Sequence, residues 1–355
     1  MNQNTPKYIV SQETTIKECL QRLNQAGVGI LLVCDSETRL QGVITDGDIR
    51  RAFLKNISFE KSCSKIANTS PLTVTGRPSN EEALHLMSSG NPFTVHQLPV
   101  LDEHGKVKDL ILRSEISDQT RTSQMNAVIM AGGFGTRLRP FTKSTPKPML
   151  PVGGTPLLER IIDQLKKNKI DNINITTHYL PEKIKDYFGN GEKYGVNINY
   201  ITEDEPLGTA GALGFIEKSN HPVLIINGDI LTQVDFSAML NFHKEQKSAL
   251  TIGVRMYEFK IPFGVVECAG PRVCTISEKP VKNVLVNAGI YLMEPEVHAR
   301  IPQNKFMNMT DVIELLLKEG KTVSSFPIME YWLDIGQIED YNKAQSDIKK
   351  IKRSE

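Results

Sequence analysis

The chain has 355 residues and a balanced charge, with 42 lysines and arginines against 41 aspartates and glutamates. This length suits two or three domains of about 100–200 residues each. The balance excludes a global field that would attract nucleic acid or a membrane surface. No apolar run approaches the ~20 residues that span a bilayer, and the polar start is unlike a signal peptide, so we expect a cytoplasmic protein.

The spacing of cysteines and histidines predicts neither a metal centre nor a disulfide framework. The seven histidines show no metal-ligand spacing, and the five cysteines form no Cys-x-x-Cys pair. The cysteines are Cys19, Cys34, Cys63, Cys268 and Cys274, and most of them fall in apolar strand or helix patterns. We therefore expect reduced structural thiols, as is usual in the cytoplasm.

An internal repeat occupies the first 118 residues. Asp35 and Asp102 stand at the same point of the two copies, as do Thr45 and Leu112. Each copy begins with a helical pattern and continues with two apolar strand patterns, with helices expected at 15–20 and 80–84 and strands at 30–35, 42–45, 98–102 and 110–112. Neither copy would bury its apolar face alone, so we expect the two to pack together as a small α+β domain over residues 1–118.

This repeat resembles a pair of cystathionine-β-synthase (CBS) motifs, modules that sense adenosine-containing ligands or mediate dimerisation. In that family a Ser/Thr-x-x-Asp element holds the ribose. Thr45 and Asp48 match the element in the first copy, whereas Leu112 and Glu115 replace it in the second. The resemblance implies an adenine nucleotide at Thr45 and Asp48 and a homo-oligomer, a dimer or a tetramer. The alternative is that Thr45 and Asp48 only cap the helix that follows, and that the pair is a scaffold.

Residues 119–125 are polar, lack apolar periodicity and predict a linker to a second domain over residues 126–350. In that domain strand and helix patterns alternate, with strands expected at 127–130, 174–177, 197–201 and 223–226 and helices at 182–188 and 209–217. The alternation predicts a doubly wound, mostly parallel, Rossmann-like α/β sheet. Sheets of this kind bind ligands at the carboxyl ends of their strands.

A glycine-rich loop follows the first of these strands. Gly132, Gly133 and Gly135 let backbone N–H groups approach an anion closely, and Arg137 and Lys147 add two positive charges. The spacing matches neither the Walker loop nor the dinucleotide-binding fingerprint. The loop therefore predicts a polyphosphate-binding site of another kind than these two.

This loop resembles the signature of the sugar-nucleotidyltransferase family, whose members join a nucleoside triphosphate to a sugar 1-phosphate and release pyrophosphate. The matching positions are Gly133, Gly135, Arg137, Pro140, Thr142 and Pro146 to Pro148. The resemblance implies that Arg137 and Lys147 are catalytic. It also implies that the triphosphate lies in a cradle of backbone groups from Ala131, Gly132, Gly133, Gly135 and Thr136.

Two aspartates are candidates for a Mg²⁺ site. Asp229 follows the strand expected at 223–226, and Asp334 precedes a glycine much later in the chain. Carboxylate oxygens suit this hard ion. In the resembled family these two positions hold the catalytic Mg²⁺ together, so Asp229 counts as both a metal ligand and a catalytic residue.

The segment from Tyr200 to Gly211 resembles the base-recognition segment of the family. Uridylyl- and thymidylyltransferases commonly carry glutamine where this chain has Glu203. An ionised glutamate only accepts hydrogen bonds, and guanine presents two adjacent donors, so Glu203 favours GTP. Gly208 and Thr209 belong to the same predicted nucleotide site. The alternative is an acidic, solvated loop.

Elements farther along the chain match the family's sugar-side contacts. Glu278 offers a carboxylate for sugar hydroxyls or an amine, and Lys279 a cation for the sugar phosphate. Glycine and amide positions complete the predicted substrate site, which comprises Gly264, Glu278, Lys279 and Asn287.

The whole chain resembles CBS-fused guanylyltransferases of bacterial surface-sugar pathways, some of which make GDP-glucosamine for legionaminic acid. The resemblance implies a Mg²⁺-dependent transfer from GTP to a sugar 1-phosphate, with glucosamine 1-phosphate the favoured acceptor. In-line attack on the α-phosphate needs positioning and charge neutralisation more than acid–base chemistry. Mannose or heptose 1-phosphate, and a uridylyl- or thymidylyltransferase, remain alternatives. A more distant alternative is a non-catalytic nucleotide-sensing adaptor.

Overall fold

The computed structural model describes residues 5–89, 95–116, 125–203 and 205–354. The chain divides into two compact units, Met1–Arg121 and Thr122–Glu355. This division falls inside the linker predicted at 119–125, of which residues 119–124 lie outside the described residues. In the part of the chain that the structure describes, no helix is both long and apolar enough to cross a bilayer.

The first unit consists of two copies of one motif, as the repeat predicts. In each copy a short strand pairs in parallel with a second strand, which pairs antiparallel with a third. The first copy contains β1 (Ile9–Ser11), α1 (Ile16–Ala26), β2 (Ile30–Cys34), β3 (Leu40–Thr45) and α2 (Asp46–Leu54). The second contains β4 (Val74–Thr75), α3 (Asn80–Ser89), β5 (Gln97–Leu101), β6 (Val107–Leu112) and α4 (Arg113–Ile116).

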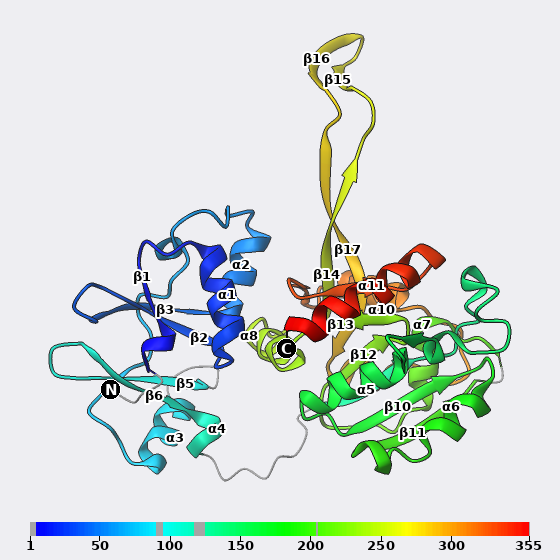
Figure 1. Cartoon of the computed structure of the whole chain (residues 1–355), viewed down its shortest axis with the longest axis horizontal. Coiled ribbons are helices and arrows are strands. Elements are labelled where there is room, and N and C mark those ends of the chain that lie inside the picture. Colours follow the sequence, from blue (N-terminus) through cyan, green and yellow to red (C-terminus); the bar gives the residue numbers. More distant parts are fainter. Residues whose placement is uncertain (1–4, 90–94, 117–124, 204, 355) are drawn as a thin grey trace. The chain divides into compact units, whose positions relative to one another are not determined.

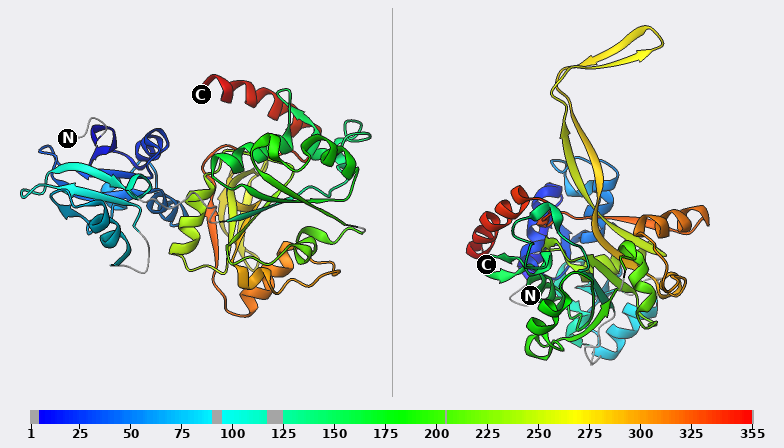
Figure 2. Two further views of the ribbon diagram at one scale, coloured as in Figure 1. Left: turned by 90° about the horizontal axis from the view of Figure 1, so that it is seen from below. Right: turned by 90° about the vertical axis from the view of Figure 1, so that its right-hand side faces the viewer.

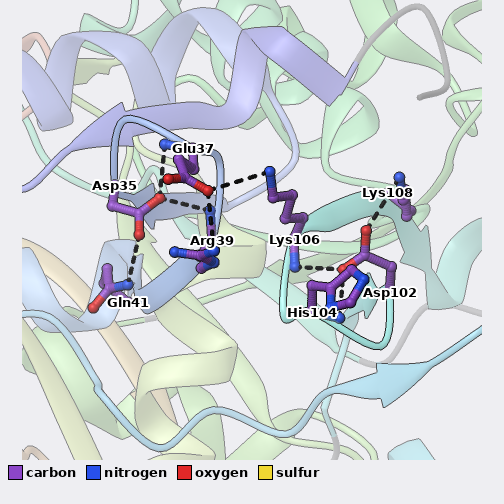
Figure 3. Close-up of polar contacts among 8 residues, drawn as sticks. All are labelled: Asp35, Glu37, Arg39, Gln41, Asp102, His104, Lys106 and Lys108. Atoms are coloured by element: carbon purple, nitrogen blue, oxygen red, sulfur yellow. Dashed lines mark hydrogen bonds and ion pairs between the residues drawn. The ribbon is translucent and has the colours of Figure 1, made fainter.

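The two copies join at the tips of their hairpins. Leu40 N donates to Gly105 O and Val107 N donates to Thr38 O, both at 3.0 Å. Asp35 and Asp102, the repeated aspartates, brace the two turns by accepting from backbone N–H groups, as Figure 3 shows for the side chains around them. The repeated aspartate therefore fixes the turn that joins the copies.

The second unit is built on a seven-stranded sheet of order β11-β10-β7-β12-β17-β14-β18 (Figures 1 and 2). Its strands are β7 (Asn126–Met130), β10 (Asn172–Thr177), β11 (Asn197–Thr202), β12 (Val223–Asn227), β14 (Leu250–Lys260), β17 (Val281–Met293) and β18 (Val323–Pro327). Only β17 runs antiparallel to its neighbours. The predicted mostly parallel α/β sheet is thus confirmed.

The order of the strands reverses between β7 and β12. From β7 the chain steps outward to β10 and β11 through α5 (Leu157–Lys167) and α6 (Pro181–Phe188), and then crosses back to β12. The return segment packs with α10 (Met309–Lys318) in one apolar core against the sheet, and Figure 2 shows helices on both faces. Neighbouring carboxyl ends at such a reversal form the crevice where α/β sheets bind ligands.

The helix predicted at 209–217 is shorter than expected. It consists of α7 (Gly208–Gly211) and a 3-10 turn (Ala212–Phe215). A Cβ on Gly211 would lie 2.4 Å from Lys305 O, and one on Gly214 would lie 2.5 Å from Pro302 O. The glycines are there because another segment of backbone runs directly against this turn, which the helical pattern alone does not reveal.

Strands β14 and β17 continue beyond the sheet as a two-stranded arm. Their pairing runs without interruption from Val254–Asn287 to Lys260–Val281, whereas β18 accompanies β14 only as far as Val254. At the far end β15 (Val265–Ala269) and β16 (Arg272–Ser277) form a separate two-stranded sheet, and Figure 1 shows the arm extending away from the sheet. Cys268 and Cys274 lie exposed on this arm, so the prediction of structural thiols fits only the three buried cysteines.

Candidate active site

The glycine loop lies at the carboxyl end of β7, at the reversal of strand order. Gly135 adopts a left-handed conformation with φ of +62°, and Thr142 Oγ1 donates to its carbonyl oxygen at 2.7 Å. A Cβ on Gly135 would lie 3.0 Å from Lys147 Cβ, so glycine lets the loop pack against the segment that carries this cation. The structure therefore brings the predicted loop, Ala131 to Thr136, and Lys147 to one place.

Lys147 and Asp229 form an ion pair in this crevice. Gly228 makes this possible, because its N–H donates to Met130 O at 2.9 Å and a Cβ there would lie 2.9 Å from the same oxygen. Among the described residues Asp229 Oδ1 is buried without a hydrogen-bond partner. A buried carboxylate oxygen without a donor is suited to a cation.

Asp334 is the second carboxylate of this cluster. It ends β19 (Trp332–Asp334), which pairs antiparallel with β13 (Ile230–Thr232), so Asp334 stands opposite Ile230, the residue after Asp229. Although Asp334 is exposed to solvent, partial desolvation by the surrounding chain and then the Asp229 carboxylate raise its pKa to about 6, whereas Lys147 and Arg137 act in the opposite direction. Two adjacent carboxylates with one orphaned oxygen fit a divalent cation, which would remove their repulsion.

The raised pKa of Asp334 predicts a pH-dependent stability. An unfolded aspartate titrates near pH ~3.9. Between that pH and about 6, the folded state holds a proton that the unfolded chain releases, so the free energy of unfolding falls as pH rises through this window. Asp334→Asn lacks this penalty. We expect it to melt above the wild type at pH 7.5 in metal-free buffer.

The advantage should shrink toward pH 4, which differential scanning calorimetry can measure. An advantage of the same size at both pH values would contradict the assignment. Asp235→Asn, which changes an exposed helix cap, is the matched control and should show no such trend.

Glu203 lies at the end of β11, next to the glycine loop, and is 8% exposed. Its Oε2 accepts the N–H of Leu207 at 3.0 Å. Its Oε1 would lie 3.3 Å from a Cβ on Gly132, so this oxygen faces the loop. Glu203, the predicted base reader, therefore lies beside the glycine loop, and one of its oxygens already holds its own turn.

His178 belongs to this corner, and the sequence analysis missed it. Its Nδ1 donates to Glu203 O at 2.8 Å, and its ring meets the exposed ring of Phe134 edge-on with centroids 5.2 Å apart. Its position directly after the strand predicted at 174–177 could have identified it, because Asp229 was selected for the same reason, namely that it follows a predicted strand. The hydrogen bond fixes the backbone from which the Glu203 side chain projects.

Gly208 and Thr209 make contacts that are internal to the fold. Gly208 has φ of +79°, and a Cβ there would lie 2.5 Å from Met307 O. Thr209 Oγ1 accepts the N–H of Met309 at 2.9 Å. In this structure both residues fix the turn after Glu203 to the start of α10, and their predicted contact with nucleotide stays a prediction.

The four predicted sugar-side residues are divided between two places. Asn287 lies on β17 close to the site. Its Oδ1 accepts Gly289 N at 3.0 Å, and Gly289 packs against Asn227, since a Cβ on Gly289 would lie 2.6 Å from Asn227 Nδ2. Gly264, Glu278 and Lys279 lie on the arm, between the paired strands that end at Lys260 and Val281 and the hairpin of β15 and β16. Within the chain, the structure does not bring these three to the cluster of Asp229 and Asp334.

In the first unit, Thr45 and Asp48 are bonded to each other. Thr45 N and Thr45 Oγ1 both donate to Asp48 Oδ2 at 2.8 Å, at the start of α2, and Asp48 Oδ1 forms an ion pair with Arg51. This is the helix cap that the sequence offers as the alternative to a ribose contact. A ribose at this position would have to compete with the cap.

The fold and the site define a nucleotidyltransferase, and comparison with known proteins agrees. The sequence pattern of the nucleotidyl transferase family matches residues 126–351, and that of the CBS domain matches residues 3–55 and 63–119. The chain belongs to the nucleotidyl transferase family and carries a pair of CBS domains.

Particular relatives are similar over a little under two thirds of the chain. A mannose-1-phosphate guanylyltransferase of Mycobacterium tuberculosis is 34% identical over 236 residues, which cover 64% of this chain and 65% of that protein. A D-glycero-α-D-manno-heptose 1-phosphate guanylyltransferase of Aneurinibacillus thermoaerophilus is 36% identical over 63% of this chain and 98% of its own length. The chain thus spans a little under two thirds of the mycobacterial relative.

A solved structure is similar over the same share of the chain. HddC from Yersinia pseudotuberculosis, complexed with GMP-PN, superposes with a TM-score of 0.50 and 27% identity. The similarity covers 63% of this chain and 99% of that one. The first unit lies outside the residues matched by the family pattern for nucleotidyl transfer.

Proposed function

We propose that this protein is a guanylyltransferase that converts GTP and a sugar 1-phosphate to a GDP-sugar and pyrophosphate. The observation that carries the proposal is the cluster of Lys147, Asp229 and Asp334 beside a glycine loop, at the point where the strand order reverses. This arrangement combines backbone donors, cations and paired carboxylates, which are the parts that transfer of a nucleotidyl group requires. Relatives that share this unit are guanylyltransferases.

The residues of the site bind two anions, the triphosphate of GTP and the phosphate of the sugar. Backbone N–H groups from Ala131 to Thr136 bind the triphosphate, and Arg137 offsets the charge that develops on the leaving pyrophosphate. Lys147 holds the attacking sugar phosphate once the carboxylates have another partner. Asp229 and Asp334 would hold Mg²⁺, which when bound supplies charge neutralisation at the α-phosphate. The transfer needs no covalent enzyme intermediate.

Glu203 supports guanine as the base. An ionised carboxylate accepts from both adjacent donors of guanine, N1–H and N2–H, and the guanylyl relatives and the GMP-PN complex of HddC agree with this choice. One oxygen of Glu203 also accepts the N–H of Leu207, so the base would share this carboxylate with the turn. Uridylyl or thymidylyl transfer is the alternative.

Glu203→Gln should erode the preference for GTP over UTP by roughly 10–100-fold in kcat/KM, because a buried polar group then faces the wrong partner. Glutamine keeps an acceptor for Leu207 N, so the turn should persist. The exposed neighbour Glu205→Gln is the matched control and should leave the ratio unchanged. An unaltered ratio in Glu203→Gln would remove Glu203 as the base reader.

The favoured acceptor is α-D-glucosamine 1-phosphate, by the resemblance to CBS-fused enzymes of legionaminic acid synthesis. Mannose and heptose 1-phosphates are the alternatives that the relatives support. A matrix of four nucleoside triphosphates against these three sugar 1-phosphates, with Mg²⁺ or a chelator, tests all the choices at once. Pyrophosphate release only with GTP, one sugar and Mg²⁺ would support the proposal. No release in any combination would favour the nucleotide-sensing adaptor.

The CBS pair would act as a regulatory and oligomerisation unit in a cytoplasmic enzyme. Its candidate ligand is an adenine nucleotide at Thr45 and Asp48. Titration calorimetry with AMP and ATP on the wild type and on Thr45→Ala tests the site. Equal affinity in both proteins would place any binding elsewhere.

A further inference from the structure

The hairpin of β15 and β16, at the end of the arm, has no core of its own (Figure 1). Of residues 265–269 and 272–277, all of which the structure describes, only Val265 is partly buried and none is fully buried. The apolar side chains of Val266, Val273 and Ile276 are 48%, 59% and 71% exposed. The strand ladder and a few side-chain contacts therefore hold the hairpin together, and such a hairpin is marginally stable in water.

Two of the five cysteines lie in this hairpin, one on each strand. Cys268 and Cys274 are exposed, whereas Cys19, Cys34 and Cys63 are buried. Small elements that cannot build a sufficient core are commonly stapled by disulfides. The two exposed thiols therefore stand where a covalent link between the strands would stabilise the hairpin.

A β-bulge places Cys274 across from Cys268. The ladder pairs Glu267 with Thr275. The next pair is Cys268 with Val273, so β16 has one residue more than β15 between the two pairs. That extra residue is Cys274, which lies opposite the step from Glu267 to Cys268. Neighbours across an antiparallel ladder have Cα atoms about 4.5–5.5 Å apart, within the range of about 4.4–6.8 Å that disulfides span.

The pleat of the two strands directs both thiols to the same face. Thr275 Oγ1 donates to Glu267 Oε2 at 3.1 Å, so these two side chains share the opposite face. Successive residues of a strand alternate between faces, and the two cysteines are the sequence neighbours of this pair. The thiol of Cys274 also donates to Arg272 O at 3.8 Å, so it leans toward the turn, the side on which Cys268 is paired. The two thiols therefore lie on one face of adjacent strands.

We propose that Cys268 and Cys274 are the site of a reversible disulfide that staples the tip of the arm, with a low-molecular-weight disulfide such as oxidised glutathione as the oxidant. The structure holds the reduced pair. One cysteine thiolate attacks oxidised glutathione, forms a mixed disulfide and expels one glutathione thiolate. The other cysteine attacks the protein sulfur of the mixed disulfide and expels the second. Two electrons pass to the oxidant, and the two protons that the protein thiols release are taken up by the two glutathione thiolates.

The exposure that admits the oxidant also makes the bond reversible. Exposed disulfides are the labile ones, which reduced glutathione can reopen, whereas buried structural disulfides resist reduction. The arm tip should therefore be stapled or open according to the ratio of oxidised to reduced glutathione. Because the open hairpin has no core, the order of the arm tip depends on that ratio.

Peptide mapping tests the bond, because trypsin cleaves after Arg272, between the two cysteines. The full chain is equilibrated with mixtures of oxidised and reduced glutathione, free thiols are blocked with iodoacetamide, and the digest is analysed by mass spectrometry. The peptide that holds Cys268 should be linked to the one that holds Cys274, and excess reduced glutathione should remove the link. A protein that stays unlinked, carries only glutathione adducts or links only to a second chain would overturn the proposal. A link that persists in reduced glutathione would equally overturn it.

Moving one thiol to the other face of the hairpin is the matched control. Cys274→Ser combined with Thr275→Cys keeps two exposed cysteines but places one of them on the face of Glu267. This protein should form at least about 10-fold less of the intrachain bond at the same glutathione ratio, since a disulfide needs Cβ atoms that face each other. Equal linkage in the two proteins would show that the thiols meet whatever their faces, against the geometry assigned to the pair.

Hydrogen exchange measures the consequence for the arm. Oxidation of the wild type should slow the exchange of amides in residues 265–277 by about 10-fold or more, because the link restricts opening of the hairpin. Cys268→Ser cannot form the bond and should exchange equally in oxidising and reducing buffer. A linked wild type whose exchange is unchanged would overturn the staple. The bond needs neither GTP nor a sugar 1-phosphate, so these results are independent of the proposed function.

Discussion

Asp229→Asn is expected to lower kcat by about 1,000-fold or more while the protein stays folded, because the site loses a charge that must be present when the phosphates react. The substitution keeps the size of the side chain. It removes the anion that pairs with Lys147 and leaves an amide where a cation would be held. The loss should appear in single-turnover measurements at saturating GTP and Mg²⁺.

The same exchange at an unrelated position provides the control. Asp235 caps α8 (Phe236–Glu245) by accepting Ala238 N at 2.9 Å, and asparagine caps helices equally well. Asp235→Asn should therefore keep wild-type turnover. If Asp229→Asn also kept it, the carboxylate cluster would not be the metal site. A collapsed circular dichroism spectrum would instead show that the Lys147–Asp229 pair is needed for folding.

The core of the site was predictable because its signals are local. A strand pattern followed by glycines or by an aspartate places these residues at a carboxyl end, and parallel strands bring their carboxyl ends to one edge. That argument predicted the meeting of the glycine loop with Asp229. The pairing of β13 with β19 then adds Asp334. That contact spans about a hundred residues, and the sequence analysis obtained it only from the resemblance.

The position of Lys279 could not be predicted, because apolar residues continue along β14 and β17 from the sheet into the arm. Nothing in the pattern marks Val254, the last residue of β14 paired with β18. The point at which β14 loses its neighbour depends on the length of β18, not on the sequence of β14. The sequence analysis predicted no strand after 223–226, so it indicated neither β14 and β17 nor their departure from the sheet.

The prediction of a helix over 209–217 was wrong about its length for a related reason. Gly211 and Gly214 read as ordinary helix positions, yet each accommodates a carbonyl oxygen from the segment before α10. Such close approach is a long-range contact. In the sequence it is indicated only by the presence of glycine. His178 was missed because a single polar residue after a strand is likewise a weak signal.

Arg137→Ala is expected to lower kcat/KM for GTP by about 1,000-fold, with little change in melting temperature. Arg137 is exposed, so its removal opens no cavity in the core. It lies near enough to Asp334 to lower the pKa of that carboxyl, which places its charge at the cluster. A guanidinium that offsets transition-state charge in phosphoryl transfer is worth about 10³-fold or more.

Arg139→Ala removes the same charge from an exposed position two residues farther along the loop, and it should have a small effect. Arg137 is among the groups that act on Asp334, and Arg139 is not. Equal losses in the two variants would mean that the loop attracts the triphosphate only through its overall charge. Arg137→Lys refines the test, because lysine keeps the charge but loses the planar fork that binds two phosphate oxygens. A variant that recovered full activity with lysine would show that the charge alone is needed.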